Sequence, residues 1–100
     1  MGGYVNSISI FDFNKLKDKN TNIIDIRSIE KFNSNHIDGA KNIPINKLIL
    51  NPDKYLLKQD IYYIYCQKGI QSRKICLILQ TKGYNVINIE GGYEAWILNN

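Results

Sequence analysis

Apolar residues along this chain come in short runs, which alternate with segments in which they recur at helical spacing. The short runs predict strands, because strands of a buried sheet are apolar throughout or alternate with polar residues; they lie at residues 7–10, 22–27, 42–44, 61–65 and 86–89. Helical spacing predicts short helices at residues 11–18, 28–33, 46–50, 72–82 and 93–98. Strands joined through helices form parallel sheets with right-handed crossovers. The pattern therefore predicts an α/β fold, with a mainly parallel sheet of four or five strands and helices on both faces.

Residues at the ends of these segments predict where the helices begin and end. Asp12, Ser28 and Ser72 are candidate N-terminal caps, because their side-chain oxygens can accept a backbone N–H of the first turn. Gly83 follows the fourth predicted helix and is typical of a C-terminal stop. The two glycines at 91–92 predict a tight turn before the last helix.

The length of 100 residues is that of a single domain, residues 1–100. The composition, 44% hydrophobic and 22% charged, is typical of a folded protein and not of a disordered one. No apolar run approaches the roughly 20 residues that cross a bilayer, and the N-terminus lacks the pattern of a secretory signal. The sequence therefore indicates a cytoplasmic protein without membrane association.

The net charge of +4 is spread along the chain. It does not form the basic patch with interleaved aromatic residues that nucleic-acid binding requires, so we expect no nucleic-acid partner and only a weak attraction for small anions. The 2 cysteines form no CxxC pair, and the single histidine is distant from them. We therefore expect no metal site and no cofactor, and no disulfide in a cytoplasmic protein.

Cys66 follows directly after the strand at 61–65, and a loop containing Gly69 leads from it into the next helix. Ligand sites of open α/β sheets lie beyond the carboxyl ends of the strands. Amide N–H groups of such a loop and of the first helical turn lack partners within the helix and stabilise a thiolate. Lys68 adds a formal positive charge. The context predicts a nucleophilic cysteine in an anion-binding loop; the alternative is a small buried residue that ends a strand.

Structural roles explain the other conspicuous residues more simply. Cys76 lies within a predicted helix beside apolar residues, and we expect both Cys76 and Trp96 to pack in the core. Asp25 and Arg27 are expected to form a local ion pair at a strand end. His36 is expected to be a loop residue that caps or hydrogen-bonds to the backbone.

Four segments of the chain form a pattern that is more specific than any one of them. They read Ile24-Asp25-Ile26-Arg27; His36-Ile37-Asp38-Gly39-Ala40 with Asn42-Ile43-Pro44; Tyr65-Cys66-Gln67-Lys68-Gly69-Ile70-Gln71-Ser72; and Gly83-Tyr84 with Glu90-Gly91-Gly92-Tyr93-Glu94-Ala95-Trp96. In order and in coverage of nearly the whole chain, they resemble the single-domain rhodanese, or thiosulfate sulfurtransferase, family. The resemblance implies a rhodanese-like fold in which Cys66 carries sulfur as a persulfide.

The resemblance also implies the rest of the site. Six residues would form the loop that binds the substrate: Gln67, Lys68, Gly69, Ile70, Gln71 and Ser72. A sulfane-sulfur donor such as thiosulfate would give sulfur to Cys66, and cyanide or a cellular thiol would remove it. A sulfur-relay protein could be the partner. Asp25, Arg27, His36 and Arg73 would be supporting residues.

The chain departs from the family pattern at two places. Gln67 and Gln71 stand where the family often has arginine, so thiosulfate would meet fewer charges, which Lys68 partly restores. Residues 35–39 read Asn-His-Ile-Asp-Gly where the family usually has Gly-His-Ile-Pro-Gly. The second change lies away from the cysteine and leaves the implied chemistry intact.

Two other functions stay open on the sequence. The domain could be a non-enzymatic relay or regulatory module that receives a persulfide from a partner protein. It could also be a cysteine-dependent phosphatase or arsenate reductase, which needs an arginine six places after the cysteine to clamp the anion. That place is Ser72, and Arg73 comes one residue later. One residue turns a helical side chain by about 100 degrees, so we expect Arg73 to point away from Cys66.

Overall fold

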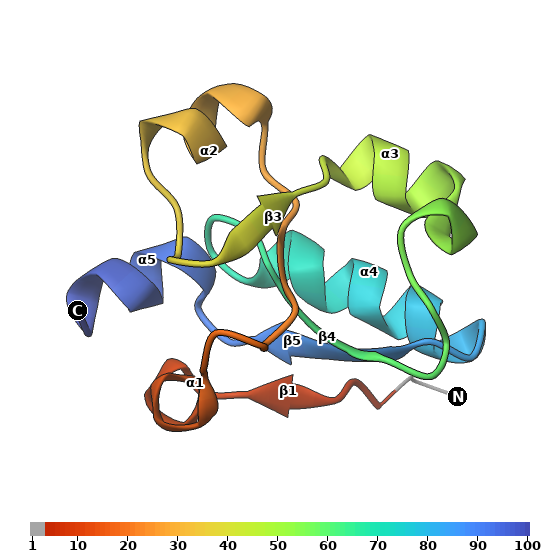
Figure 1. The fold of residues 1–100 in the computed structure, drawn as a ribbon, viewed down its shortest axis with the longest axis horizontal. Coiled ribbons are helices and arrows are strands. Elements are labelled where there is room, and N and C mark those ends of the chain that lie inside the picture. Colours follow the sequence, from red (N-terminus) through yellow and green to blue (C-terminus); the bar gives the residue numbers. More distant parts are fainter. Residues whose placement is uncertain (1–3) are drawn as a thin grey trace.

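The computed structural model describes residues 4–100, which form one five-stranded sheet with helices packed against it (Figure 1). The strands are β1 (Ser7–Ile8), β2 (Ile23–Asp25), β3 (Ala40–Asn42), β4 (Ile61–Tyr65) and β5 (Asn85–Ile89). Their order across the sheet is β1-β5-β4-β2-β3, and every neighbouring pair is parallel. The predicted α/β fold is confirmed.

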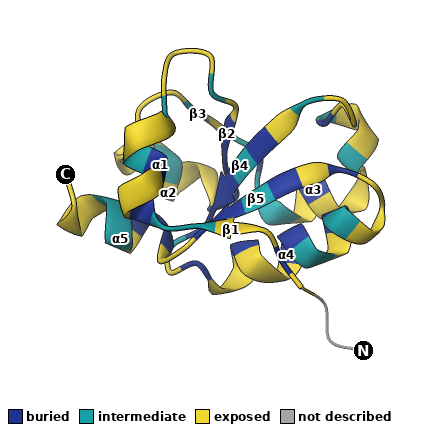
Figure 2. Cartoon of the chain, turned by 90° about the horizontal axis from the view of Figure 1, so that it is seen from below, coloured by how far each residue is buried: buried dark blue, intermediate teal, exposed yellow. Residues whose placement is uncertain are grey.

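Short helices connect the strands and cover both faces of the sheet. They are α1 (Ile10–Leu16), α2 (Ile29–Ser34), α3 (Ile45–Leu50), α4 (Ile70–Thr81) and α5 (Gly92–Leu98), with a 3-10 turn, η1, at Pro52–Lys54. Successive side chains of a strand point to opposite faces. Ile24 and Ile64 accordingly pack in one core cluster with α3 and α4, whereas Ile23 and Tyr65 pack in another with α1 and α5. Figure 2 shows buried residues along β4 and β5, and an exposed outer side of α4.

The carboxyl ends of the strands meet at one edge of the sheet because all the strands run in the same direction. In the register of the sheet, Asp25 at the end of β2 lies beside Tyr65 at the end of β4. Cys66 follows Tyr65 directly, and Glu90 follows the end of β5. Segments that are far apart in the sequence are therefore brought together at this edge.

Several boundaries in the first half differ from those predicted. β1 ends earlier than expected because Ser9 caps α1, its Oγ accepting the N–H of Asp12 at 3.0 Å. Asp12, the expected cap, therefore lies within the first turn. β2 ends at Asp25, whose carboxylate accepts the N–H of Arg27 at 2.8 Å and so turns the chain. β3 also begins and ends before the expected strand, whereas Ser28 caps α2 as predicted.

The main correction in the second half concerns the start of α4. Its cap is Gly69, with φ at 90°, and the helix begins at Ile70 instead of after Ser72. Glycine adopts this left-handed conformation without the steric cost that other residues meet. The chain therefore enters the helix earlier, and Ser72 lies in the first turn, where its N–H points at Cys66.

The last two helices differ in length and burial. Trp96 on the short helix α5 is half-buried and not fully in the core as expected; its ring lies 5.8 Å from that of Tyr93, at the edge of the cluster. α4, with 12 residues, is the longest helix of residues 4–100. None of the helices in that range has the length and apolar character needed to cross a membrane.

Candidate active site

Cys66 lies where β4 ends, under an arc formed by the following loop and the first turn of α4. Its Sγ accepts the N–H of Gly69 at 3.1 Å and the N–H of Ser72 at 3.3 Å. A Cβ on Gly69 would lie 2.8 Å from the backbone nitrogen of Gly91, so only glycine fits this turn. Two backbone donors at the positive end of a helix therefore stabilise negative charge on the sulfur.

The sulfur is reached from solvent through one hollow. Cys66 is 5% exposed and lines a hollow of about 480 Å³. The lining residues are Lys31, Cys66, Gln67, Lys68, Ile70, Gln71 and Lys74. The backbone N–H groups of Lys68, Ile70 and Gln71 have no acceptor among residues 4–100. They remain available to an anion that enters the hollow.

The charge around the hollow is positive. Lys31 comes from α2, Lys68 from the loop and Lys74 from α4, and no acidic side chain lines the space within the described chain. Sequence reasoning identified Lys68 alone. Lys74 follows Ile70 by one helical turn and could have been inferred from that spacing, whereas Lys31 reaches the site only through the fold.

α5 supports the loop from behind. The N–H of Tyr93 donates to the carbonyl of Cys66 at 2.9 Å, and the N–H of Glu94 donates to that of Gln67 at 3.1 Å. Gly92, with φ at 61°, permits this approach, since a Cβ there would lie 2.3 Å from the Cys66 carbonyl oxygen. With these carbonyls held behind the loop, its amides face the sulfur. The sequence indicated only a turn at this glycine and missed its contact with the site.

A buried polar pair connects Cys66 to β5. The hydroxyl of Ser72 donates to Oδ1 of Asn88 at 2.6 Å, and the thiol of Cys66 donates to Ser72 Oγ at 3.4 Å. Ser72 is 0% exposed and Asn88 is 2% exposed. Sequence reasoning missed Asn88; the available signal was a polar residue two places after Val86, at a core-facing position of the strand.

Asp25 and Arg27 form the expected ion pair, which is buried and continues to the active-site loop. Arg27 Nη2 lies 2.8 Å from Asp25 Oδ2, and Nε donates to both carboxylate oxygens at 3.1 Å. Arg27 Nη1 donates to Oε1 of Gln67 at 3.1 Å. Burial opposes the charged guanidinium, but the hydrogen bonds and charge of Asp25 outweigh it and raise the pKa of Arg27. The pair therefore holds Gln67 from the side of β2.

Tyr65 extends this cluster across the sheet. Its hydroxyl donates to Asp25 Oδ2 at 2.7 Å and accepts the N–H of Ile37 at 3.1 Å. Burial and the bond to Asp25 raise the pKa of Tyr65 above its usual range, so the hydroxyl stays a neutral donor. His36 bonds to the backbone, as expected, and its partner lies in α2: its Nδ1 is 2.9 Å from the carbonyl oxygen of Phe32. His36 does not line the hollow at Cys66.

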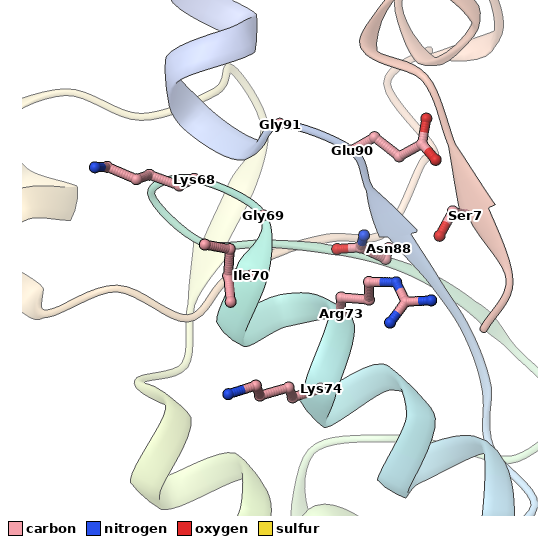
Figure 3. Close-up of a pocket in the computed structure, with 9 residues that line it drawn as sticks. All are labelled: Ser7, Lys68, Gly69, Ile70, Arg73, Lys74, Asn88, Glu90 and Gly91. Carbon is pink, nitrogen blue, oxygen red and sulfur yellow. The ribbon is translucent and has the colours of Figure 1, made fainter. Parts of the chain in front are cut away.

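Arg73 and Cys76 do not line the hollow at Cys66. Arg73 lines a neighbouring hollow of about 330 Å³ that does not contain Cys66 (Figure 3). Its side chain points toward β5, in agreement with the direction expected from helical spacing. Cys76 is 0% exposed within the core, where burial, with a smaller contribution from Cys66, raises the pKa of its thiol to about 12. Cys76 is therefore a packing residue.

The site thus consists of a cysteine in a short loop between a strand of a parallel sheet and a helix. The sequence model of the rhodanese-like domain matches residues 12–99. The chain therefore belongs to the rhodanese-like domain family. It is similar in structure to a rhodanese-like domain protein from Staphylococcus aureus, with a TM-score of 0.78 and 33% identity, covering 91% of this chain and 90% of the other.

Two relatives from Bacillus subtilis carry names that refer to sulfur. The chain is 31% identical over 81 residues to "Putative sulfurtransferase YtwF", covering 79% of this chain and 76% of YtwF. It is 31% identical over 80 residues to "Putative sulfur carrier protein YrkF", covering 79% of this chain and 43% of YrkF. Other relatives are also longer, and the chain spans 59% and 51% of two of them.

Proposed function

We propose that this domain is a sulfurtransferase that carries sulfane sulfur as a persulfide on Cys66. The observation that carries the proposal is the environment of the Cys66 sulfur. Two backbone N–H groups point at it from 3.1 and 3.3 Å, and it lies under a hollow whose charged side chains within the described chain are all lysines. Such a site favours a thiolate nucleophile and then an anionic persulfide.

The first half-reaction loads the cysteine. The thiolate of Cys66 attacks the outer sulfur of a donor such as thiosulfate, and a new S–S bond forms. The S–S bond of thiosulfate breaks, and sulfite leaves with the bonding electron pair. The enzyme is left with a persulfide anion, whose outer sulfur the free N–H groups of Lys68, Ile70 and Gln71 can stabilise.

The second half-reaction removes the transferred sulfur from Cys66. Cyanide or the thiolate of a small molecule attacks the outer sulfur of the persulfide. The S–S bond breaks and its electron pair returns to Cys66 Sγ, which regenerates the thiolate. The product is thiocyanate or a new persulfide, and no electrons are gained or lost overall.

We assign the other site residues by their contacts. Lys31, Lys68 and Lys74 attract the donor dianion, and Lys68 is the one that the loop itself supplies. Arg27, paired with Asp25, holds Gln67 and so supports the loop. Neither His36 nor Arg73 lines the hollow at Cys66, so we assign neither a direct part in sulfur transfer.

A relay role is the second candidate, and the name of one relative favours it. One relative is named a sulfur carrier protein, and this chain spans 43% of it, so the matching part there is one portion of a longer protein. In a relay, a partner protein would load Cys66 and free thiosulfate would not. Turnover with thiosulfate as the only donor separates the two candidates.

A phosphatase or arsenate reductase is less well supported. Those enzymes need an arginine that clamps the anion beside the cysteine. In the described chain no arginine lines the hollow at Cys66, and Arg73 lines the neighbouring one.

The experiment that tests the proposal is thiocyanate formation from thiosulfate and cyanide. Cys66→Ser should abolish it, because a serine hydroxyl cannot form a persulfide. The matched control is Cys76→Ala, which should keep most of the activity because Cys76 only fills core volume. Activity that survives in Cys66→Ser and disappears in a folded Cys76→Ala would refute the assignment. Persulfide formation with a partner protein alone would instead support the relay.

A further inference from the structure

Asn88 is a buried polar residue that ends a chain of hydrogen bonds to the reactive sulfur. It lies on β5 beneath α4 and is 2% exposed. Its Oδ1 accepts the hydroxyl hydrogen of Ser72 at 2.6 Å, and Ser72 Oγ in turn accepts the thiol hydrogen of Cys66 at 3.4 Å. Asn88 itself does not line the hollow at Cys66, so it can affect the sulfur only through Ser72.

The single hydrogen of the Ser72 hydroxyl limits what this chain can do. While that hydrogen goes to Asn88, the oxygen presents only lone pairs to Cys66. This arrangement suits a thiol, which has a hydrogen to give. A thiolate has none, and it would face lone pairs where it needs a donor. The thiolate is better stabilised when the Ser72 hydroxyl turns toward the sulfur.

The side chain of Asn88 can permit that turn. An amide carries an acceptor and two donors. Half a turn about its last bond exchanges Oδ1 and Nδ2, so that Nδ2 donates to Ser72 Oγ and frees the hydroxyl hydrogen for Cys66. In the present orientation Nδ2 has no acceptor among residues 4–100, so the exchange gives up no bond that Nδ2 now makes. The side chain borders the hollow that also contains Arg73 (Figure 3), which leaves room for either orientation.

We propose that Asn88 is a positioning residue that sets the direction of the Ser72 hydroxyl and thereby the balance between thiol and thiolate at Cys66. The inference rests on the proposed role of Cys66 as the nucleophile. It assigns to Asn88 no contact with substrate. Its readout is the reactivity of the cysteine toward an alkylating agent, so it can fail or succeed whether or not the protein transfers sulfur.

Other charged groups near the chain must stay constant in the test. Three lysines, Lys31, Lys68 and Lys74, face the hollow at Cys66, while Arg73 and Glu90 lie around Asn88 and Cys76 lies in the shared core. None of them makes a hydrogen bond to Ser72 or Asn88 within the described chain. Variants at position 88 leave all these groups in place.

The test measures the rate of Cys66 alkylation by iodoacetamide as a function of pH, in a Cys76→Ala background. Asn88→Leu removes both the acceptor and the donor of the amide, so the Cys66 sulfur becomes the acceptor left for the Ser72 hydroxyl hydrogen in this chain of hydrogen bonds. A thiolate accepts that hydrogen better than a thiol does, so the pH midpoint of alkylation should fall by about half to one unit. Asn88→Asp keeps an acceptor and adds negative charge, so its midpoint should rise. Opposite shifts from two variants at one position cannot come from loosened packing alone.

Two controls make the result decisive. Val86→Ala disturbs the same face of β5, where Val86 is 0% exposed, and should lower stability without moving the midpoint. In a Ser72→Ala background, Asn88→Leu should no longer move the midpoint, because the hydroxyl that carries the effect is gone. An unchanged midpoint in Asn88→Leu, or an equal shift with and without the Ser72 hydroxyl, would overturn the proposal. If Asn88→Asp does not fold, the pair of Asn88→Leu measurements still decides.

Discussion

Cys66 and Cys76 are the same residue type ten positions apart, and their surroundings give them different chemistry. Cys66 Sγ accepts hydrogen bonds from two backbone N–H groups, and Cys66 borders a hollow lined by lysines. Cys76 has no polar partner within the described residues, and burial first, then Cys66, raises the pKa of its thiol to about 12. Since the thiolate is the reactive form, Cys76 stays inert at neutral pH. Reactivity in this chain is therefore decided by local donors and exposure.

Lys68 gives a prediction at the scale of one side chain. The loop from Cys66 to Gln71 has Gln67 and Gln71 at positions where the rhodanese family often has arginine. Lys68 is therefore the only formally charged side chain in this loop. Lys68→Ala should raise the KM for thiosulfate about tenfold and lower kcat less, since the charge acts on bound substrate and transition state alike. Steady-state kinetics with varied thiosulfate measures both constants.

The control for Lys68→Ala is a lysine with the same charge and no part in the hollow. Lys19 precedes β2 and so lies toward the opposite edge of the sheet. Lys19→Ala should leave KM unchanged. Equal effects of the two variants would show that the net charge of the protein matters and not the position of Lys68.

The element that supports the loop is the start of α5, and its glycine gives the second prediction. A Cβ on Gly92 would lie 2.3 Å from the Cys66 carbonyl oxygen and 2.9 Å from the Gly69 nitrogen. Gly92→Ala should therefore displace the loop, lower the free energy of unfolding by more than about 2 kcal/mol, and remove most sulfur transfer. Urea unfolding and initial rates of thiocyanate formation measure the two effects.

Gly39→Ala separates backbone strain from displacement of the loop. Gly39 also has a positive φ, 88°, but the nearest atom to a Cβ there is Ile23 Cδ1 at 3.9 Å. Gly39→Ala should lower the free energy of unfolding by about 1 kcal/mol through backbone strain alone. It should keep its sulfur-transfer activity. A Gly92→Ala protein as active as Gly39→Ala would show that α5 does not hold the loop in place.

Elements whose signal is local were predicted well from the sequence. β4 matches its prediction, Ile61–Tyr65, because a run of β-branched and aromatic residues bounded by polar ones favours a strand on its own. The start of α4 was misplaced because Gly69 and Ser72 are both acceptable caps. The choice depends on the left-handed turn at Gly69, which packs against Gly91, far along the chain.

The parts of the site that the sequence missed come from contacts between distant segments. Asn88 reaches Ser72, and Lys31 reaches the hollow at Cys66, only once the strands are arranged in the sheet. Gly92 was identified as a turn, but its contact with the Cys66 carbonyl requires the position of α5. Cys66 could be proposed as the reactive residue from the sequence because its strand, its loop and its helix are consecutive in the chain.

At the scale of the whole molecule, burial of ionisable groups links stability to pH. Tyr65 and Cys76 are both 0% exposed, and the pKa of each is raised, in Cys76 from 9.0 to about 12. The unfolded chain therefore releases these protons at lower pH than the folded protein does. Their contribution to stability is complete below pH 9.0 and is lost as the pH rises from there toward the folded-state values.

The third prediction follows from this difference. Above about pH 9 the free energy of unfolding should fall by about 1.4 kcal/mol per pH unit for each group that stays protonated only in the folded state. Urea unfolding at several alkaline pH values measures the slope. Cys76→Ala should make the slope shallower, because one of the two groups is gone. A free energy of unfolding that stays constant through this range, or rises, would contradict the burial of these groups.

The central claim is that Cys66 carries the sulfur, and the mass of the protein after incubation with thiosulfate tests it most directly. Intact-mass spectrometry, followed by peptide mapping without reductant, should show one added sulfur atom located on Cys66. The addition should disappear on treatment with cyanide and should never form in Cys66→Ser. No added sulfur on a folded protein with a free Cys66 thiol, or an added sulfur located on Cys76, would contradict the account.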